Sequence, residues 1–409
     1  MLPVEIRPSI YWVGVNDRST ELFEGLWPIR EEGVSYNSYL INDEKKAIID
    51  LSSLASTEEL LEMIRSITDP AGMDYIVINH LEPDHSGALR LFRTIAPQAK
   101  LLCSAKCAEM LSTFYGITEG VLVMKDGDTV ELGKHTLKFI ATPFVHWPET
   151  IMTYEVKEQI LFSCDGFGGY GALDGCIFDD PGVPVPWYKE QALRYYVNIV
   201  ASVSRAVRTA LAKLADVPVK IVAPSHGLIW RNHPERIIEL YNQWANYAIE
   251  PATNGITFLY ASMYGNTRKM MESVAQGIAD AGLPVSMFNV QKTHASYILP
   301  SLWTKKGVMI GAPTYEGELF PYMAHVLDLA KRKNVSNKLA AGFGSHAWAG
   351  GGQRQLATLV EGLKWELSGS LEFKGAPELA DLQKGREFGA EFARKVLTFT
   401  LPEPKPKAS

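Results

Sequence analysis

The stretch HLEPDHSG, residues 80–87, places two histidines and two carboxylates within six residues, directly after the apolar run YIVIN. In an extended segment alternate side chains point the same way, so His80, Glu82 and Asp84 can project together. Pro83 turns the chain and lets His85 join them. Gathering these donors without a cation costs too much electrostatically, and imidazole and carboxylate are the usual donors for borderline divalent metals. The stretch therefore predicts a metal site.

Three further ligand candidates, His146, Asp165 and His226, each follow a later β-like run. Each lies where an apolar run meets a loop containing Gly or Pro, a usual place for a site built on a rigid scaffold. A lone histidine at a strand end is more often simply hydrogen bonded. Added to the first four residues, however, the set offers enough donors for two metal ions, and Asp165 can bridge them.

The two halves of the 409-residue chain differ in pattern. Up to about residue 230, short β-like runs dominate, with helical stretches such as 56–67 between them. Beyond residue 255, short apolar runs alternate regularly with helical segments, which is typical of a doubly wound parallel sheet. We therefore expect one domain over 1–250, a linker containing Pro251 and Gly255, a second domain over 255–402, and a disordered Pro- and Lys-rich tail at 403–409.

Composition narrows the function classes. The net charge of −6, with Lys and Arg spread thinly, disfavours a nucleic-acid partner. No run approaches the roughly 18 to 20 apolar residues that cross a bilayer, and the N-terminus lacks the pattern of a secretory signal, so no membrane is expected and the location is cytoplasmic. None of the four cysteines forms a C-x-x-C pair, which argues against a zinc ribbon or a built-in rubredoxin module.

The loop SMYGNTRKM, residues 262–270, directly follows the apolar run 256–261 and opens a helical segment. Gly265 permits a tight backbone turn, and the N-terminus of the following helix offers N–H groups to a phosphate. Neither G-x-x-x-x-G-K-[ST] nor G-x-G-x-x-G is present, so ATP and dinucleotides fit poorly. An ordinary strand–turn–helix is the alternative explanation for this loop.

Two later loops, 311–320 and 342–352, follow central β-like runs on the edge where doubly wound sheets bind ligands. Their Gly and aromatic residues suit a flat ring. The three loops resemble those of flavodoxin, which implies FMN as cofactor. The candidate FMN-binding residues are Ser262, Met263, Tyr264, Gly265, Asn266, Thr267, Pro313, Thr314, Tyr315, Glu316, Gly317, Ser345, His346, Ala347, Trp348, Gly350 and Gly351.

The pattern H-x-[HE]-x-D-H, followed by separate His, Asp and His, resembles the metallo-β-lactamase superfamily. Glu82 at the third position, where the hydrolases have His, resembles the flavodiiron proteins. A carboxylate there makes the donor set harder and more anionic, which suits iron better than zinc. The resemblance implies an N-terminal αββα sandwich and two irons: one held by His80, Glu82 and His146, and the other by Asp84, His85 and His226, with Asp165 bridging.

This resemblance implies an enzyme that reduces O2 to water and/or NO to N2O at a non-haem diiron site, with FMN supplying electrons. It further implies an external electron donor, rubredoxin or another carrier, and a head-to-tail homodimer or a dimer of dimers. Glu24, Trp27, Trp147 and Tyr170 are candidates for lining the gas pocket, although simple packing explains the aromatic residues equally well.

Two other functions remain open from the sequence. The first is a zinc-dependent hydrolase fused to a flavodoxin domain, which would hydrolyse its substrate without any reductant. The second is an electron carrier or gas sensor that binds O2 or NO without turnover.

Overall fold

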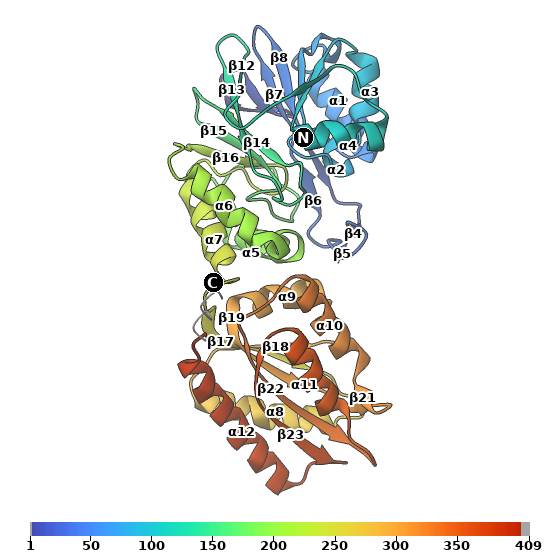
Figure 1. Cartoon of the computed structure of the whole chain (residues 1–409), viewed down its shortest axis with the longest axis vertical. Coiled ribbons are helices and arrows are strands. Elements are labelled where there is room, and N and C mark those ends of the chain that lie inside the picture. The colour runs from blue at the N-terminus through green and yellow to red at the C-terminus, as the bar shows by residue number, and fades with distance from the viewer. Residues whose placement is uncertain (1, 402–409) are drawn as a thin grey trace, which may run out of the picture. The chain divides into compact units, whose positions relative to one another are not determined.

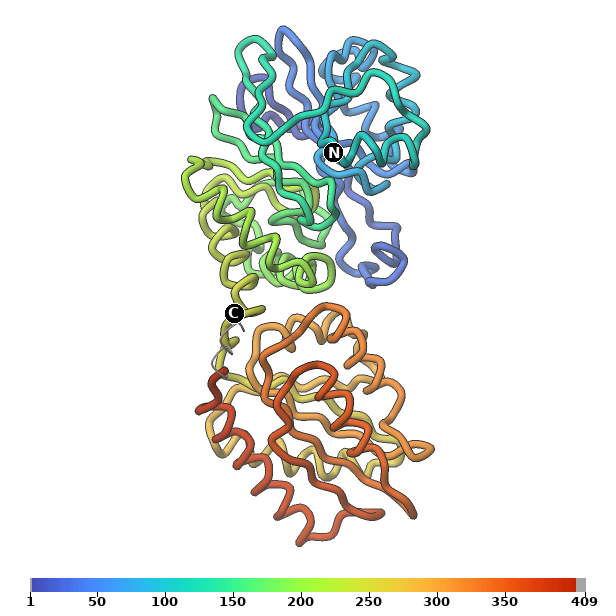
Figure 2. Tube along the Cα trace, viewed as in Figure 1, coloured from blue at the N-terminus to red at the C-terminus, as the bar shows by residue number. Residues whose placement is uncertain are grey.

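The computed structural model describes residues 2–401, so the tail expected at 403–409 lies outside the described residues. The chain folds into two compact units that meet between Ala245 and Asn246 (Figures 1 and 2). Among the described residues, none of the helices combines the length and apolar character that a membrane span requires. All four cysteines are free thiols, and three of them are buried.

The N-terminal unit contains two large sheets. The first has the strand order β1-β2-β7-β8-β9-β10-β11. Its pairs are antiparallel from β1 to β8 and parallel from β8 to β11. The strands are β1 (Val4–Arg7), β2 (Ile10–Trp12), β7 (Tyr39–Asn42), β8 (Lys46–Ile49), β9 (Tyr75–Val77), β10 (Lys100–Cys103) and β11 (Val121–Val123).

The second sheet has the order β12-β13-β14-β15-β16, and only its last pair is parallel. Its strands are β12 (Thr129–Glu131), β13 (Thr136–Ala141), β14 (Ile151–Glu155), β15 (Ile160–Cys164) and β16 (Ile221–Pro224). Every residue of β14, β15 and β16 is buried, as expected for strands covered on both faces.

Helices cover this pair of sheets. α1, α3 and α4 lie together beside the first sheet, and α5, α6 and α7 form a second group (Figure 1). Their bounds are α1 (Thr57–Arg65), α2 (Pro83–Ser86), α3 (Leu89–Ile95), α4 (Ala105–Tyr115), α5 (Val185–Tyr195), α6 (Ser204–Leu214) and α7 (Pro234–Asn246). A π-helical turn, Tyr196–Val200, continues α5. The predicted αββα arrangement is confirmed.

The run SYNSYLI, residues 35–41, has the pattern of a single strand in the sequence, but the structure divides it. Residues Val34–Tyr36 form β6, which pairs with β3 (Val15–Asp17), whereas β7 belongs to the first large sheet. The break falls at Asn37, whose side chain donates to the carbonyls of Pro224 and Gly227 instead of extending a strand. A small hairpin of β4 (Leu22–Phe23) and β5 (Trp27–Pro28) precedes β6.

The C-terminal unit is a parallel five-stranded sheet in the order β18-β17-β19-β22-β23. This is the flavodoxin-like order 2-1-3-4-5, whose ligand crevice lies at the carboxyl ends of the strands. The strands are β17 (Thr253–Tyr260), β18 (Val285–Asn289), β19 (Lys305–Gly311), β22 (Leu339–His346) and β23 (Glu366–Lys374). The short pair β20 (Thr314–Tyr315) and β21 (Glu318–Leu319) follows β19.

Five helices accompany this sheet: α8 (Asn266–Asp280), α9 (Ala295–Thr304), α10 (Pro321–Arg332), α11 (Gly352–Gly362) and α12 (Leu379–Thr398). α8 and α12 pack against each other through glycines. A Cβ atom on Gly277 would lie 1.8 Å from the carbonyl oxygen of Arg386, and one on Gly389 would lie 2.1 Å from that of Val274. The close approach brings both helices onto the core that contains Phe258, Met309 and Phe343.

Lys338 is a buried lysine at the start of β22. Its side chain is 1% exposed, and its Nζ donates to the carbonyls of Trp303 and Lys305 at 2.9 and 2.8 Å. Burial lowers the pKa of this ammonium from 10.5 to about 7. The Lys338 ammonium therefore satisfies carbonyl groups at the C-terminal end of α9, although burial disfavours its charged form.

Lys338 makes a prediction for the pH dependence of stability. Between its folded pKa near 7 and its unfolded pKa near 10.5, the unfolded chain holds one more proton than the folded chain. The free energy of unfolding therefore rises with pH in this window, by up to about 1.4 kcal/mol per pH unit. Urea unfolding of wild type and Lys338→Met from pH 7 to 10 should show that the variant lacks this slope. The exposed Lys384→Met serves as control, and an unchanged slope in Lys338→Met would contradict the assignment.

Candidate metal centre and nucleotide-binding crevice

The predicted metal ligands come from the carboxyl ends of strands in both large sheets of the N-terminal unit. His80 and Glu82 follow β9, and Asp84 and His85 lie in α2, which Pro83 opens at a favourable first helical position. His146 follows β13, Asp165 follows β15 and His226 follows β16. The two sheets therefore supply donors from opposite sides of one site.

The seven side chains gather as two neighbouring sets of potential ligands. One set comprises His80, Glu82, His146 and Asp165, and the other Asp84, His85 and His226; within each set the ligand atoms lie within 4.8 Å of one another. In the first set, Glu82 Oε2 lies 3.1 Å from His80 Nε2 and 3.2 Å from His146 Nε2. In the second, Asp84 Oδ2 lies 3.4 Å from His85 Nε2 and 3.3 Å from His226 Nε2.

Asp165 lies between the two sets and presents one oxygen to each. Its Oδ2 lies 3.4 Å from His80 Nε2 and 3.2 Å from His146 Nε2. Its Oδ1 lies 3.0 Å from His85 Nε2 and 3.4 Å from His226 Nε2. A carboxylate placed in this way can bridge two ions, and all four imidazoles present the same nitrogen to the centre.

Two of the imidazoles are fixed from behind by groups that the sequence did not reveal. Glu149 Oε1 accepts hydrogen bonds from His80 Nδ1 at 2.6 Å and from the Leu81 N–H at 3.0 Å. The carbonyl of Ser35 accepts from His226 Nδ1 at 2.7 Å. Because both acceptors require a protonated Nδ1, they leave the Nε2 lone pair for a metal. The sequence offered one signal for the role of Glu149, which is its position three residues after His146 in the same loop.

The electrostatics favour cations. Burial lowers the pKa of His80, but hydrogen bonds to Glu149 and Glu82 outweigh it and raise that pKa to about 10. Burial likewise opposes a protonated His226, and Asp165 and Asp84 raise its pKa to about 10. Burial raises the pKa of Glu82, yet its two histidine partners bring it down to about 2. Metal ions must therefore displace protons from these rings, so metal affinity falls as the solution becomes more acidic.

The residues present fit a pair of metal ions. Several buried polar atoms of the cluster have no hydrogen-bond partner among residues 2–401: Asp84 Oδ1, both oxygens of Asp165, and the Nε2 atoms of His85 and His226. Orphaned groups of this kind are costly unless something else satisfies them. Three carboxylates and four imidazoles, without a thiolate donor among the predicted ligands, form a hard, anionic set that suits iron.

Aromatic rings surround the cluster. Of the predicted pocket residues, Trp147 packs edge-on against His80 with ring centroids 5.0 Å apart. Tyr170 lies one ring further away, because it contacts Tyr195 at 5.2 Å, and Tyr195 lies 5.6 Å from His226. Tyr195 was not among the predicted pocket residues. The pair of adjacent tyrosines, Tyr195 and Tyr196, was the one feature of the sequence that could have pointed to it.

Glu24 and Trp27, the other two predicted pocket residues, belong to the β4–β5 hairpin. Trp27 is fully buried, and its Nε1 donates to Glu24 Oε2 at 3.2 Å across the turn. Phe23, next to Glu24, packs edge-on against His226 at 5.4 Å. The hairpin therefore reaches the metal centre through Phe23, which the sequence did not single out.

In the C-terminal unit, the three predicted loops surround a cavity of about 530 Å³. This volume is within the range of small-molecule sites. The predicted residues that line it are Ser262, Met263, Tyr264, Asn266, Thr267, Pro313, Thr314, Tyr315, Glu316, Gly317, Ser345, His346, Ala347 and Trp348, and Ala349 and Gly375 join them.

The predicted glycines at 265, 350 and 351 shape the loops instead of lining the cavity. Gly265 adopts a φ of +98° and is the N-cap of α8 without a side-chain cap, which leaves the first N–H groups of the helix for a ligand. Gly351, with a φ of +152°, passes so close to Gly317 that a Cβ atom would lie 2.0 Å from its carbonyl oxygen. Thr267 Oγ1 lies 2.9 Å from Ser345 Oγ and ties two of the loops together.

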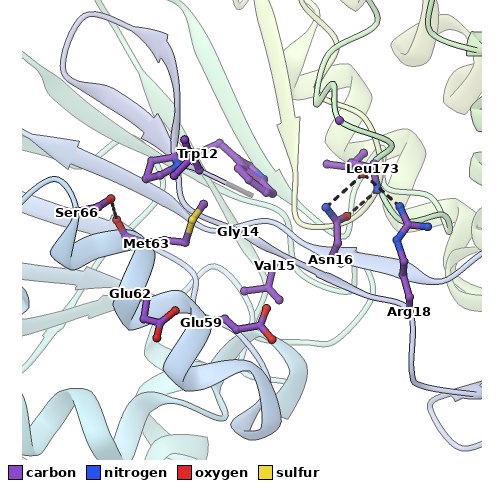
Figure 3. A pocket seen from close by; sticks show the side chains of 13 residues that line it. Trp12, Gly14, Val15, Asn16, Arg18, Glu59, Glu62, Met63, Ser66 and Leu173 are labelled. Atoms are coloured by element: carbon purple, nitrogen blue, oxygen red, sulfur yellow. Dashed lines mark hydrogen bonds between the residues drawn. The ribbon is translucent and has the colours of Figure 1, made fainter.

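A separate cavity of about 640 Å³ lies beside α1 in the N-terminal unit (Figure 3). Trp12, Val15, Met63 and Leu173 form its apolar part, and Glu59 and Glu62 stand at its rim. None of the seven predicted metal ligands lines this cavity, so it is distinct from the metal centre.

Comparisons with known proteins agree with this division into units. Residues 34–227 match the family described as ODP family beta lactamase, and residues 258–389 match the Flavodoxin family. The anaerobic nitric oxide reductase flavorubredoxin of Salmonella arizonae is 35% identical over 414 residues, which cover 100% of this chain and 85% of that protein.

Solved structures show the same relationship over both units. The rubredoxin oxygen:oxidoreductase of Desulfovibrio gigas superposes with a TM-score of 0.91 at 29% identity and covers 97% of this chain and 99% of its own. The flavodiiron protein of Giardia intestinalis gives a TM-score of 0.92 at 28% identity, with 97% of each chain covered. Together with the 35% identity to a relative of which this chain covers 85%, these likenesses show that the chain belongs to the flavodiiron protein family.

Proposed function

We propose that this protein reduces O2 to water and/or NO to N2O at a non-haem diiron centre, using electrons delivered through FMN. The observation that carries the proposal is Asp165, which is 1% exposed and offers one oxygen to each of two histidine pairs. Glu82 in place of the hydrolase histidine points to iron instead of zinc. The curated relative is an anaerobic nitric oxide reductase, and the structural neighbour from Desulfovibrio gigas is an oxygen oxidoreductase.

We assign the ligands as the resemblance implies. His80, Glu82 and His146 would hold one iron, Asp84, His85 and His226 would hold the other, and Asp165 would bridge them. Together, two ferrous ions and reduced FMN supply the four electrons that convert O2 to two waters, and two electrons suffice to couple two NO into N2O and water.

For FMN, we propose that the N-terminus of α8 and the side chains of Ser262, Asn266 and Thr267 hold the phosphate. The loops after β19 and β22 would enclose the isoalloxazine ring, with Tyr315 and Trp348 at its faces or edges. The absence of a Walker or dinucleotide motif in these loops supports a mononucleotide. Gly351 supports the assignment because it lets the third loop approach Gly317 closely.

We further propose a rubredoxin-type carrier as electron donor and a head-to-tail homodimer, or a dimer of such dimers, as the assembly. Trp348 and Tyr264, at the rim of the FMN crevice, are 90% and 93% exposed. Because these two large aromatic side chains line the same crevice, their exposure supports a protein interface at its rim. The four free thiols support a cytoplasmic location.

The test of the function is a comparison of gas consumption with cofactor content. Purified protein should contain about two irons and one FMN per chain and should consume O2 and/or NO when supplied with reduced rubredoxin. The same preparation should show no metal-dependent hydrolysis of a thioester or phosphodiester. Stoichiometric zinc without iron, together with hydrolysis in the absence of reductant, would contradict the proposal.

A further inference from the structure

A buried arginine joins three segments around the metal centre. Arg194, in the last turn of α5, is 3% exposed. Its Nη1 donates to Glu32 Oε1 at 2.8 Å and to Gln191 Oε1 at 3.3 Å, and its Nη2 donates to the carbonyl of Pro28. Its guanidinium lies over the ring of Tyr170, 5.0 Å from the centroid. One side chain thus ties α5 to residues 22–36, here called the strap, and to the loop that follows Asp165.

Two of these segments place a ring beside His226, and the third packs a ring against those two. The strap carries Phe23, which packs edge-on against His226 at 5.4 Å. α5 carries Tyr195, whose ring lies 5.6 Å from His226. The loop carries Tyr170, which packs edge-on against Phe23 at 5.5 Å and Tyr195 at 5.2 Å. Phe23, Tyr170 and Tyr195 form what we call the aromatic wall.

The strap and the loop also meet through their backbones. The N–H of Gly171 donates to Gly33 O at 3.0 Å, and that of Ala172 donates to Glu32 O at 2.9 Å. These bonds fix where the two segments touch, but they do not fix the rings of Phe23 and Tyr170. The Arg194 guanidinium fixes these rings, because it bonds to the strap at two points and covers the Tyr170 ring of the loop.

Stability alone is a poor explanation for this ion pair. Both partners are nearly buried, with side chains 4% and 10% exposed. Replacing such a pair by apolar residues of similar volume is often neutral or stabilising. What the pair provides is geometry, because the planar guanidinium offers fixed donor directions and a flat face that lysine lacks.

We propose that Arg194, paired with Glu32, is a positioning residue that sets the aromatic wall on the His226 side of the metal centre and thereby sets the preference between NO and O2. This inference rests on the proposed gas-reductase function. NO reduction must accommodate two diatomic molecules, whereas O2 reduction accommodates one. Displacement of the wall therefore changes the two reactions unequally.

The experiment compares Arg194→Lys and Glu32→Gln with wild type. We expect the ratio of kcat/KM for NO to that for O2 to change at least about tenfold in both variants, since a misplacement near 1 Å can cost about 100-fold in rate. Iron and FMN content should stay at wild-type levels. The electron paramagnetic resonance spectrum of the half-reduced iron pair should shift in the same variants, which gives a readout independent of turnover.

Arg231 provides a matched control in the same unit. It donates to Asp180 and lies over the ring of Phe178, 3.6 Å from the centroid. Arg231→Lys breaks a comparable arginine–carboxylate–aromatic arrangement that does not border His226. We expect it to lower thermal stability while both the NO-to-O2 ratio and the spectrum stay unchanged.

The outcomes separate the possibilities. The positioning role would be overturned by variants that have normal iron and FMN, an NO-to-O2 ratio within twofold of wild type, and a spectrum that equals that of wild type within error. If the single variants do not fold, the double variant Arg194→Met with Glu32→Leu restores an apolar contact and should show the changed ratio. A wild-type protein that reduces neither gas would overturn the proposed function, and the spectral shift would then decide the positioning role by itself.

Discussion

Asp165→Ala should reduce gas-reductase activity by at least about 100-fold while FMN stays bound. The side chain is 1% exposed and faces all four histidines of the cluster, two with each oxygen. Burial raises the pKa of this carboxyl, but the surrounding histidines, His85 first, hold it well below its ordinary value, which favours the anionic form of Asp165. Removing it takes away the shared ligand and leaves four imidazoles without their common partner.

Iron analysis and flavin absorbance of the same preparation test this prediction. Iron should fall to about one per chain or less, and FMN should remain near one. Asp179→Ala is the control, because Asp179 is a buried carboxylate of the same unit that accepts from the N–H groups of Arg231, Asn232 and His233. That variant should lose stability yet keep both irons. Full activity in Asp165→Ala would show that the bridging assignment is wrong.

Glu149→Gln should weaken iron binding or activity by about 10- to 100-fold. Glu149 is 1% exposed and orients His80 by accepting from its Nδ1, and its charge makes the ring a better electron donor. The glutamine keeps the shape but loses the charge. The amide NH2 of the glutamine would also take the place of Glu149 Oε2. That buried atom has no hydrogen-bond partner in the described part of the chain, so no acceptor waits for the NH2 there.

The chain contains a second buried carboxylate–histidine pair that serves as control. Glu155 Oε1 lies 3.0 Å from His135 Nδ1, and both residues are buried away from the predicted ligands. Competition with a ferrous chelator should show weaker iron binding in Glu149→Gln and unchanged binding in Glu155→Gln. Equal iron affinity in wild type and Glu149→Gln would remove the orienting role of Glu149.

The candidate metal ligands could be found from the sequence because their chemistry is local or is set at strand ends. Residues 80–85 contain four potential metal ligands within one short loop, and few arrangements other than a metal site explain such a density. His146, Asp165 and His226 carried little information singly, and only the first cluster made a joint site the better interpretation. The structure brings all seven together, as it also brings together the three loops around the crevice.

The groups that support the ligands were not predictable for identifiable reasons. The contact between Glu149 and His80 joins residues 69 positions apart, and no periodicity connects them. The acceptor for His226 is the carbonyl of Ser35, and a backbone carbonyl leaves no trace in the choice of side chain. Arg194 reads as an ordinary residue of an amphipathic helix until the strap and the Tyr170 loop fold onto it.

The prediction of one strand over residues 35–41 was wrong for a related reason. The run contains enough β-favouring residues for one strand, and local pattern does not show that Asn37 bonds to carbonyls nearly two hundred positions away. Tertiary hydrogen bonds override local propensity at such points. One consequence is functional, because the break lets Ser35 face His226 while Tyr39 stays in the large sheet.

The anchoring of His80 by Glu149 and of His226 by Ser35 bears on how the protein acquires its metals. Because hydrogen bonds of the fold hold these two rings, we expect the ligands to be arranged before a metal ion binds. Loading is then a late event on a finished scaffold, unlike a zinc finger, which needs its ion in order to fold. A chelator should strip the iron and leave a folded chain that can be refilled. The same donor set also accepts zinc, which is redox-inert, so we expect zinc to compete with iron for these ligands.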